Sequence, residues 1–207
     1  MSLASPFKQN SDFFSSKKSE PNFAFQEIIE EALQIINSIL QYNESKSQTN
    51  ENYSIFDGEM PELNIFKNKS SDSLHSSEDD EYSTSKSDCD LEDFEIYIKK
   101  WSKYFEFDEN NIILSLMNLD KLLAKDFILS KKNYYKVIYI CMMITHKFYD
   151  DNTYNNKDYA KFIGVTAEEL LEMEMEFLNT VDFNLFISVE EFQNYKQKLS
   201  DFFNNNI

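Results

Sequence analysis

The strongest constraint on the fold lies in residues 134–144, which read YYKVIYICMMI and contain one charged side chain, Lys136. Wound as a helix, this stretch is apolar nearly all round, and a helix of that kind is buried on most of its sides. It is shorter than the roughly 18 apolar residues that a membrane span needs. The stretch therefore predicts a central helix inside a soluble helical domain.

Polar residues in the neighbouring segments indicate where further helices begin. We expect six helices and no strand between residues 90 and 203. Asp90 and Asp108 stand where they would cap the first two helices, and Ser130 opens the third, which contains the apolar stretch. The pattern predicts an all-α domain.

The second half of this region carries its own helix signals. A short fourth helix at about 157–163 ends at Gly164, because glycine adopts positive φ without penalty. Two capping boxes predict where the last two helices start. They pair Thr166 with Glu169 and Ser188 with Glu191.

An amphipathic helix is predicted ahead of this region, at 22–43, and residues 1–21 are expected to form a disordered N-terminus. Apolar side chains recur on one face of the predicted helix at helical spacing. They are Ile28, Leu33, Ile36 and Leu40.

Residues 44–89 are predicted to be an acidic, Ser-rich linker. Their Ser, Asp and Glu content buries too little apolar surface to offset the entropy lost on ordering. Three apolar residues within the linker are candidate anchors that touch the domain. They are Ile55, Phe56 and Phe66.

Composition excludes several classes of function. The net charge of −17 argues against a nucleic-acid partner, because phosphate binding needs clustered positive charge. The two glycines leave no glycine-rich phosphate loop, and the two histidines and two cysteines lack metal-ligand spacing. We expect no enzyme activity, cofactor, metal or membrane partner, and an intracellular protein in the cytoplasm, the nucleus or both.

Residues 144–188 read ITHKFYDDNTYNNKDYAKFIGVTAEELLEMEMEFLNTVDFNLFIS. A buried helix ends in Lys-Phe, and then come Asp-Asp, Tyr-Asn-Asn-x-x-Tyr-Ala-Lys, a helix rich in Leu and Glu, and Asp-Phe-x-Leu. This order and spacing resemble the second half of a cyclin box, most closely that of P/U-type cyclins related to fungal phosphate-pathway regulators. The resemblance implies one five-helix cyclin box at 90–183, flanked by an N-terminal helix and a C-terminal helix at 188–203.

The resemblance also selects two candidate kinase-binding residues. By composition alone, Lys147 is a cation near a helix C-terminus, worth about 0.3–1 kcal/mol to that helix. In the cyclin family, a Lys at this position hydrogen-bonds kinase backbone near the regulatory helix. The matching acid is Glu174, nine residues before the Phe of Asp-Phe, although an acidic face in solvent is the plain alternative.

Further positions match the family signature and are expected to have structural roles. Asp120 in MNLDKL matches the Asp of Leu-Asp-Arg-Leu, and its partner is left open among Lys99, Lys100 and backbone groups. The others surround the loop after the central helix, where Asn favours turns and caps. They are Phe148, Tyr154, Asn155, Asn156 and Tyr159.

The resemblance implies a regulatory subunit that binds and activates a cyclin-dependent serine/threonine protein kinase. The alternative is a cyclin-fold adaptor or scaffold that binds without activating, which needs the same surface. The subfamily is associated with phosphate signalling, and control of the cell cycle is equally open.

Overall fold

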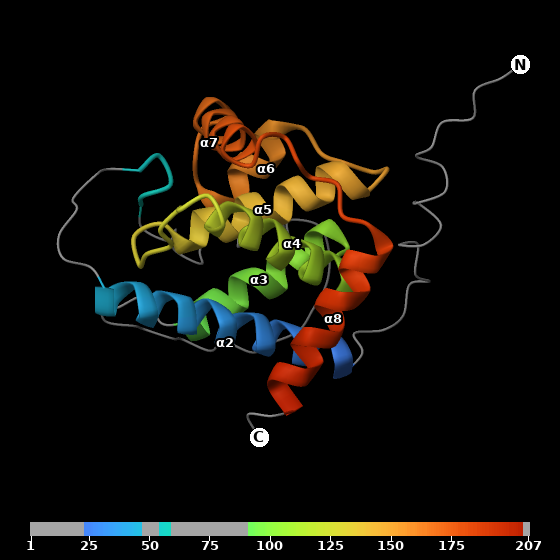
Figure 1. Cartoon of the computed structure of the whole chain (residues 1–207). Coiled ribbons are helices and arrows are strands. Elements are labelled where there is room, and N and C mark those ends of the chain that lie inside the picture. The colour runs from blue at the N-terminus through green and yellow to red at the C-terminus, as the bar shows by residue number, and fades with distance from the viewer. Residues whose placement is uncertain (1–22, 47–53, 59–90, 205–207) are drawn as a thin grey trace, which may run out of the picture.

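The computed structural model describes residues 23–46, 54–58 and 91–204 (Figure 1). The predicted N-terminal segment 1–21, most of the linker, the anchor Phe66 and the cap Asp90 lie outside these described residues. Within them the chain forms helices and no strand, so the prediction of an all-α fold is confirmed. The helices are α2 (Phe23–Lys46), α3 (Leu91–Phe105), α4 (Glu109–Leu123), α5 (Tyr134–Tyr149), α6 (Asn156–Ile163), α7 (Ala167–Thr180) and α8 (Val189–Asn204).

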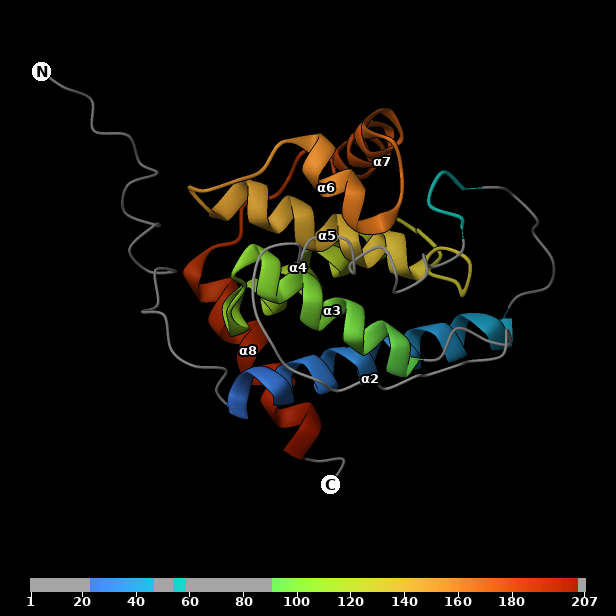
Figure 2. The ribbon, with the colours of Figure 1, turned by 180° about the vertical axis from the view of Figure 1, so that it is seen from behind.

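Helix α5 runs through the middle of the domain. It packs against α4 on one side and against α6 and α7 on the other, while α2 crosses α3 and α4 at the far side of the molecule (Figures 1 and 2). Helix α8 packs on α4 next to α2. The domain is therefore layered, with α2 and α8 at one end and α6 and α7 at the other.

The burial of α5 follows from its sequence. Its side chains are buried from Tyr134 to His146, with Lys136 the one half-buried exception. The prediction that residues 134–144 form the central helix is confirmed.

The start of α5 differs from the prediction. Ser130 does not open the helix; its carbonyl instead accepts from the Asn133 and Tyr134 N–H groups in a turn before it. The Asn133 side chain closes this turn, since it accepts from Ser130 N–H (2.8 Å) and donates to the Ile128 carbonyl (3.0 Å). A buried Asn that ties the loop to itself thus delays the helix to Tyr134.

The other helix signals that fall on described residues are confirmed. Asp108 caps α4 through the Asn111 N–H, and the Asn111 side chain returns a hydrogen bond to the Asp108 N–H. The φ of Gly164, which ends α6, is 67°. Both capping boxes form: Thr166 with Glu169 at α7, and Ser188 with Glu191 at α8.

Replacing Thr166 with Ala should lower the free energy of unfolding by about 1 kcal/mol, because the hydroxyl satisfies the otherwise open Glu169 N–H. Urea unfolding of the two chains measures the difference. Thr180→Ala is the matched control, since that hydroxyl only bonds back to the Glu176 carbonyl within α7. Equal losses of unfolding free energy in the two variants would show that the cap stabilises the domain no more than the Thr180 hydroxyl does.

Candidate functional site

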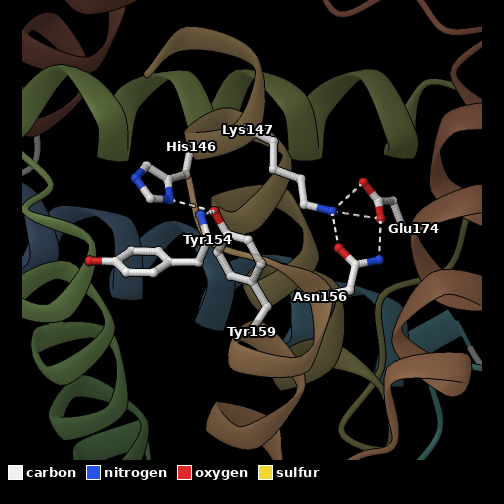
Figure 3. A network of polar contacts seen from close by, with 6 residues as sticks. All are labelled: His146, Lys147, Tyr154, Asn156, Tyr159 and Glu174. Atoms are coloured by element: carbon white, nitrogen blue, oxygen red, sulfur yellow. Dashed lines mark hydrogen bonds and ion pairs between the residues drawn. The ribbon is translucent and has the colours of Figure 1, made fainter. Parts of the chain in front are cut away.

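Two charged side chains predicted from the sequence meet where α5 and α7 face each other (Figure 3). The Lys147 ammonium lies 2.7 Å from both carboxylate oxygens of Glu174. Asn156, the first residue of α6, bridges the pair: its carbonyl oxygen accepts from Lys147 at 2.6 Å and its amide donates to Glu174 at 3.3 Å. Three helices thus contribute to one polar cluster.

The packing of the two helices fixes this pair. Lys147 follows directly after the buried part of α5, so its backbone cannot shift independently of the core. On α7, Leu170, Met173 and Phe177 form the buried face. Glu174 lies at the edge of that face, and only 14% of its side chain is exposed.

The alternating glutamates of α7 divide as helical geometry predicts. Glu172 and Glu176 are exposed, whereas Glu174 points back to α5. Glu174 is therefore distinct from the solvated acidic face.

The pair keeps hydrogen-bonding capacity for a partner. A carboxylate has about four lone-pair positions, and Glu174 uses them for Lys147 and Asn156 only in part. All three ammonium hydrogens of Lys147 have an acceptor within the chain, so a contact from Lys147 to another molecule must replace one of these bonds. The Glu174 carboxylate is therefore a fixed hydrogen-bond acceptor. The Lys147 ammonium beside it is a donor that can exchange one of its present acceptors for another.

Exposed apolar side chains lie close to the pair in sequence. Phe148 is next to Lys147, is 37% exposed and packs its ring edge-on against Tyr149. Leu171 is 49% exposed and precedes Glu174 by three positions, so both lie toward the same side of α7. Met175 is 40% exposed and directly follows Glu174, so it points to a neighbouring side of the helix.

A second polar network lies beside the pair (Figure 3). The Tyr159 hydroxyl contacts Nδ1 of His146 at 2.7 Å and accepts from the Tyr154 N–H at 3.3 Å. Burial lowers the pKa of His146 to about 4. The Tyr159 carbonyl accepts from the Tyr139 hydroxyl at 2.6 Å, which ties α6 to the middle of α5.

The predicted loop residues have different partners, and only some of them join these two networks. Asn155 caps α6 through the Asp158 N–H, as turn chemistry predicts. Asn156 is part of the ion-pair cluster instead, a contact that the sequence analysis did not anticipate. Tyr154 reaches α3, where its hydroxyl donates to the Tyr104 carbonyl at 3.3 Å.

Asp120 has a partner other than Lys99, Lys100 and backbone groups, which were the partners considered from the sequence. The Tyr195 hydroxyl on α8 donates to its carboxylate, whereas Lys99 pairs with Glu95 on its own helix. The next residue, Lys121, donates to the carbonyls of Asn184 and Phe186. This part of α4 therefore holds the C-terminal segment on the domain.

In the part of the chain that the structure describes, no group of three His, Cys, Asp or Glu side chains is arranged to hold a metal ion. No helix in the same ranges is long and apolar enough to cross a membrane.

The family profile for cyclins matches residues 24–185, which is most of the chain. The chain therefore belongs to the cyclin family, whose members are regulatory subunits. The match begins within α2 and ends shortly before α8.

Individual relatives narrow the subfamily. Cyclin-U4-2 of Arabidopsis thaliana is 30% identical over 105 residues, covering 50% of this chain and 49% of that protein. PHO85 cyclin-7 of Saccharomyces cerevisiae is 31% identical over 122 residues, covering 52% and 42%. Cyclin-P2-1 of Oryza sativa subsp. japonica is 28% identical over 104 residues, covering 50% and 48%. The resemblance to P/U-type cyclins is confirmed, and the chain spans about half the length of the curated relatives it matches.

Proposed function

We propose that this chain is the regulatory subunit of a cyclin-dependent serine/threonine protein kinase, and that it binds and activates the kinase through the surface around Lys147 and Glu174. The observation that carries the proposal is the ion pair itself. It is fixed by the packing of α5 and α7, and the exposed apolar residues Phe148 and Leu171 lie close to it in sequence. Family membership gives the class of partner.

Recognition combines apolar burial with hydrogen bonds to backbone. Phe148, Leu171 and Met175 offer the area from which water is removed. Glu174 has acceptor capacity for a backbone N–H, and Lys147 can exchange its bond to Asn156 for one to a backbone carbonyl. Such charged hydrogen bonds fix the register of the two proteins and add affinity.

Activation follows from the rigidity of this surface. A protein kinase is active only when its Lys–Glu ion pair and its activation loop are in place. A partner that binds the active arrangement better shifts the population toward it. Because α5 is buried along most of its length, the surface at its end is suited to select one arrangement of the kinase.

The chain itself is proposed to carry out no phosphoryl transfer and to bind no nucleic acid or membrane. The whole sequence has two glycines and a net charge of −17, which suit neither a glycine-rich phosphate loop nor phosphate contacts. We place it inside the cell, in the cytoplasm, the nucleus or both, where its proposed partner acts. Cys141 fits that setting, because it is a buried free thiol whose pKa is raised by burial.

An affinity purification from native cells tests the choice of partner. Tagged wild-type chain should enrich a kinase of the cyclin-dependent class, identified by mass spectrometry. The chain carrying Lys147→Ala and Glu174→Ala should lose this kinase, while Glu172→Ala should retain it. Failure to enrich any such kinase, or equal enrichment by all three chains, contradicts the proposal.

A further inference from the structure

Five residues between α2 and α3 are seated on the body of the domain. Residues 54–58 read SIFDG and belong to the part of the chain that the structure describes. The stretches on either side of them, 47–53 and 59–90, lie outside that part. Phe56 is 1% exposed and belongs to the core. Ile55 is partly buried and packs against the core. The Phe56 ring meets Phe127 edge-on, with 5.6 Å between centroids and 84° between planes.

Two hydrogen bonds to backbone hold the segment beyond this aromatic contact. The Gly58 N–H donates to the Lys132 carbonyl at 2.9 Å. The Lys136 ammonium donates to the Asp57 carbonyl at 3.0 Å, across 79 positions in the sequence. Lys136 is the one charge in the apolar stretch of α5, so this contact gives that residue a role.

The segment holds its own shape. The Asp57 N–H donates to the Ser54 carbonyl at 2.8 Å, which closes a turn. The Ser54 N–H donates to the Asp57 carboxylate at 3.1 Å, and the Phe56 N–H donates to the Ser54 hydroxyl at 3.3 Å. Because these bonds are local, a short peptide of this sequence carries the information for the turn.

Gly58 lies close to the end of the Lys136 side chain. A Cβ at this position would lie 2.7 Å from Nζ of Lys136 and 2.9 Å from its Cε, so a larger residue would require the end of this flexible side chain to shift. Lys136 therefore lies against both the Asp57 carbonyl and the Gly58 backbone.

We propose that Phe127, Lys132, Tyr135 and Lys136 form a peptide-binding site, here named the Phe56 site, for a short turn of the type Ser-x-Phe-Asp-Gly. In this chain residues 54–58 fill the site in cis. Phe56, the partly buried Ile55 and two hydrogen bonds to backbone make up the contact, and no covalent link holds it. A tethered ligand prevails through its high effective concentration, so a like segment of a partner protein takes its place only where that segment binds more tightly.

A labelled peptide of residues 52–60 tests the site without any kinase, so the outcome is independent of the proposed function. The peptide is titrated by fluorescence anisotropy against the full wild-type chain and against full-length Phe56→Ala, in which the site is vacated. A peptide with Phe56→Ala is the matched control. Circular dichroism of each chain checks that the helices persist.

The peptide should bind Phe56→Ala saturably and at least roughly tenfold more tightly than wild type, whose own segment competes. The control peptide should bind neither chain. Adding Lys136→Ala to the Phe56→Ala chain should weaken peptide binding again. Equal affinity for wild type and Phe56→Ala, or no saturable binding to folded Phe56→Ala, overturns the proposal and leaves residues 54–58 as a fixed part of the core.

The peptide experiment also covers the case in which Phe56→Ala fails to fold. Gly58→Pro removes the N–H that donates to the Lys132 carbonyl while leaving the aromatic side chain in place. The peptide should bind Gly58→Pro more tightly than it binds wild type, because the competing segment is weakened. Unchanged binding to folded Gly58→Pro overturns the proposal equally.

Discussion

A chain with Lys147→Ala and Glu174→Ala should bind its kinase roughly tenfold or more weakly than wild type and remain folded. Hydrogen bonds to charged groups contribute about 1.5–3 kcal/mol each, and about 1.4 kcal/mol corresponds to a factor of ten in affinity. Both residues are changed together because either single change would leave the other charge partly buried without its partner. Isothermal titration calorimetry gives the affinity, and circular dichroism gives the helicity.

Glu172→Ala is the matched control for this pair. It removes one carboxylate from α7, as Glu174→Ala does. The position is exposed and faces away from Lys147. Its affinity should stay close to that of wild type. Full affinity in the double variant, or loss of helicity together with affinity, would show that the ion pair is not the contact.

His146 should make the domain less stable between pH 6.5 and pH 4. Burial lowers its pKa in the folded chain to about 4, whereas an unfolded His has a pKa of about 6.5. Above pH 6.5 both states are neutral. Between the two values the unfolded chain binds a proton that the folded chain does not, so the free energy of unfolding falls as pH falls. The difference amounts to about 3 kcal/mol at 1.36 kcal/mol per pKa unit.

Urea unfolding of wild type and His146→Gln at pH 7, 5.5 and 4 isolates this contribution. Every other titrating group is common to both chains. Wild type should lose more stability than the variant on going to pH 4. Asp150→Asn serves as a control, because the contribution of Asp150 to the free energy of unfolding changes with pH in the opposite sense. Burial and nearby Asp108 raise the pKa of Asp150 to about 6, so this carboxyl favours the folded state as pH falls. Parallel pH profiles for wild type and His146→Gln would contradict the account of His146.

The features that could be predicted from the sequence are those set by neighbouring residues. The apolar run of α5 and the caps at Asp108, Thr166 and Ser188 depend on spacings of a few positions, and the structure has them. Ser130 was wrong as the start of α5 because the Asn133 side chain closes a turn on Ser130 N–H and the Ile128 carbonyl before the helix begins.

Partners across the fold could not be predicted in this way. Asp120 finds Tyr195 on the last helix, and Asn156 joins the ion pair rather than only shaping its loop. Such contacts depend on how helices cross, which no local spacing encodes. Phe56 lies between these cases: its apolar character inside a polar tract marks it as an anchor, but the place where it binds depends on long-range packing.

The His146–Tyr159 contact was missed although the sequence holds a signal for it. A histidine on the buried face of an apolar helix needs a polar partner, and a tyrosine follows 13 positions later. That Lys147 and Glu174 bind the kinase stays a prediction, since what the structure gives is their contact with each other.

The central claim is activation, and a kinase assay with purified components tests it most directly. The kinase recovered with the chain is assayed on a peptide substrate alone, with wild-type chain, and with the Lys147→Ala, Glu174→Ala chain at equal concentration. Wild type should raise the rate of phosphorylation by roughly tenfold or more, which requires a preference for the active arrangement of only about 1.4 kcal/mol. The double variant should need a far higher concentration for the same rate. A kinase that binds the wild-type chain yet works no faster would contradict activation and identify the chain as a scaffold.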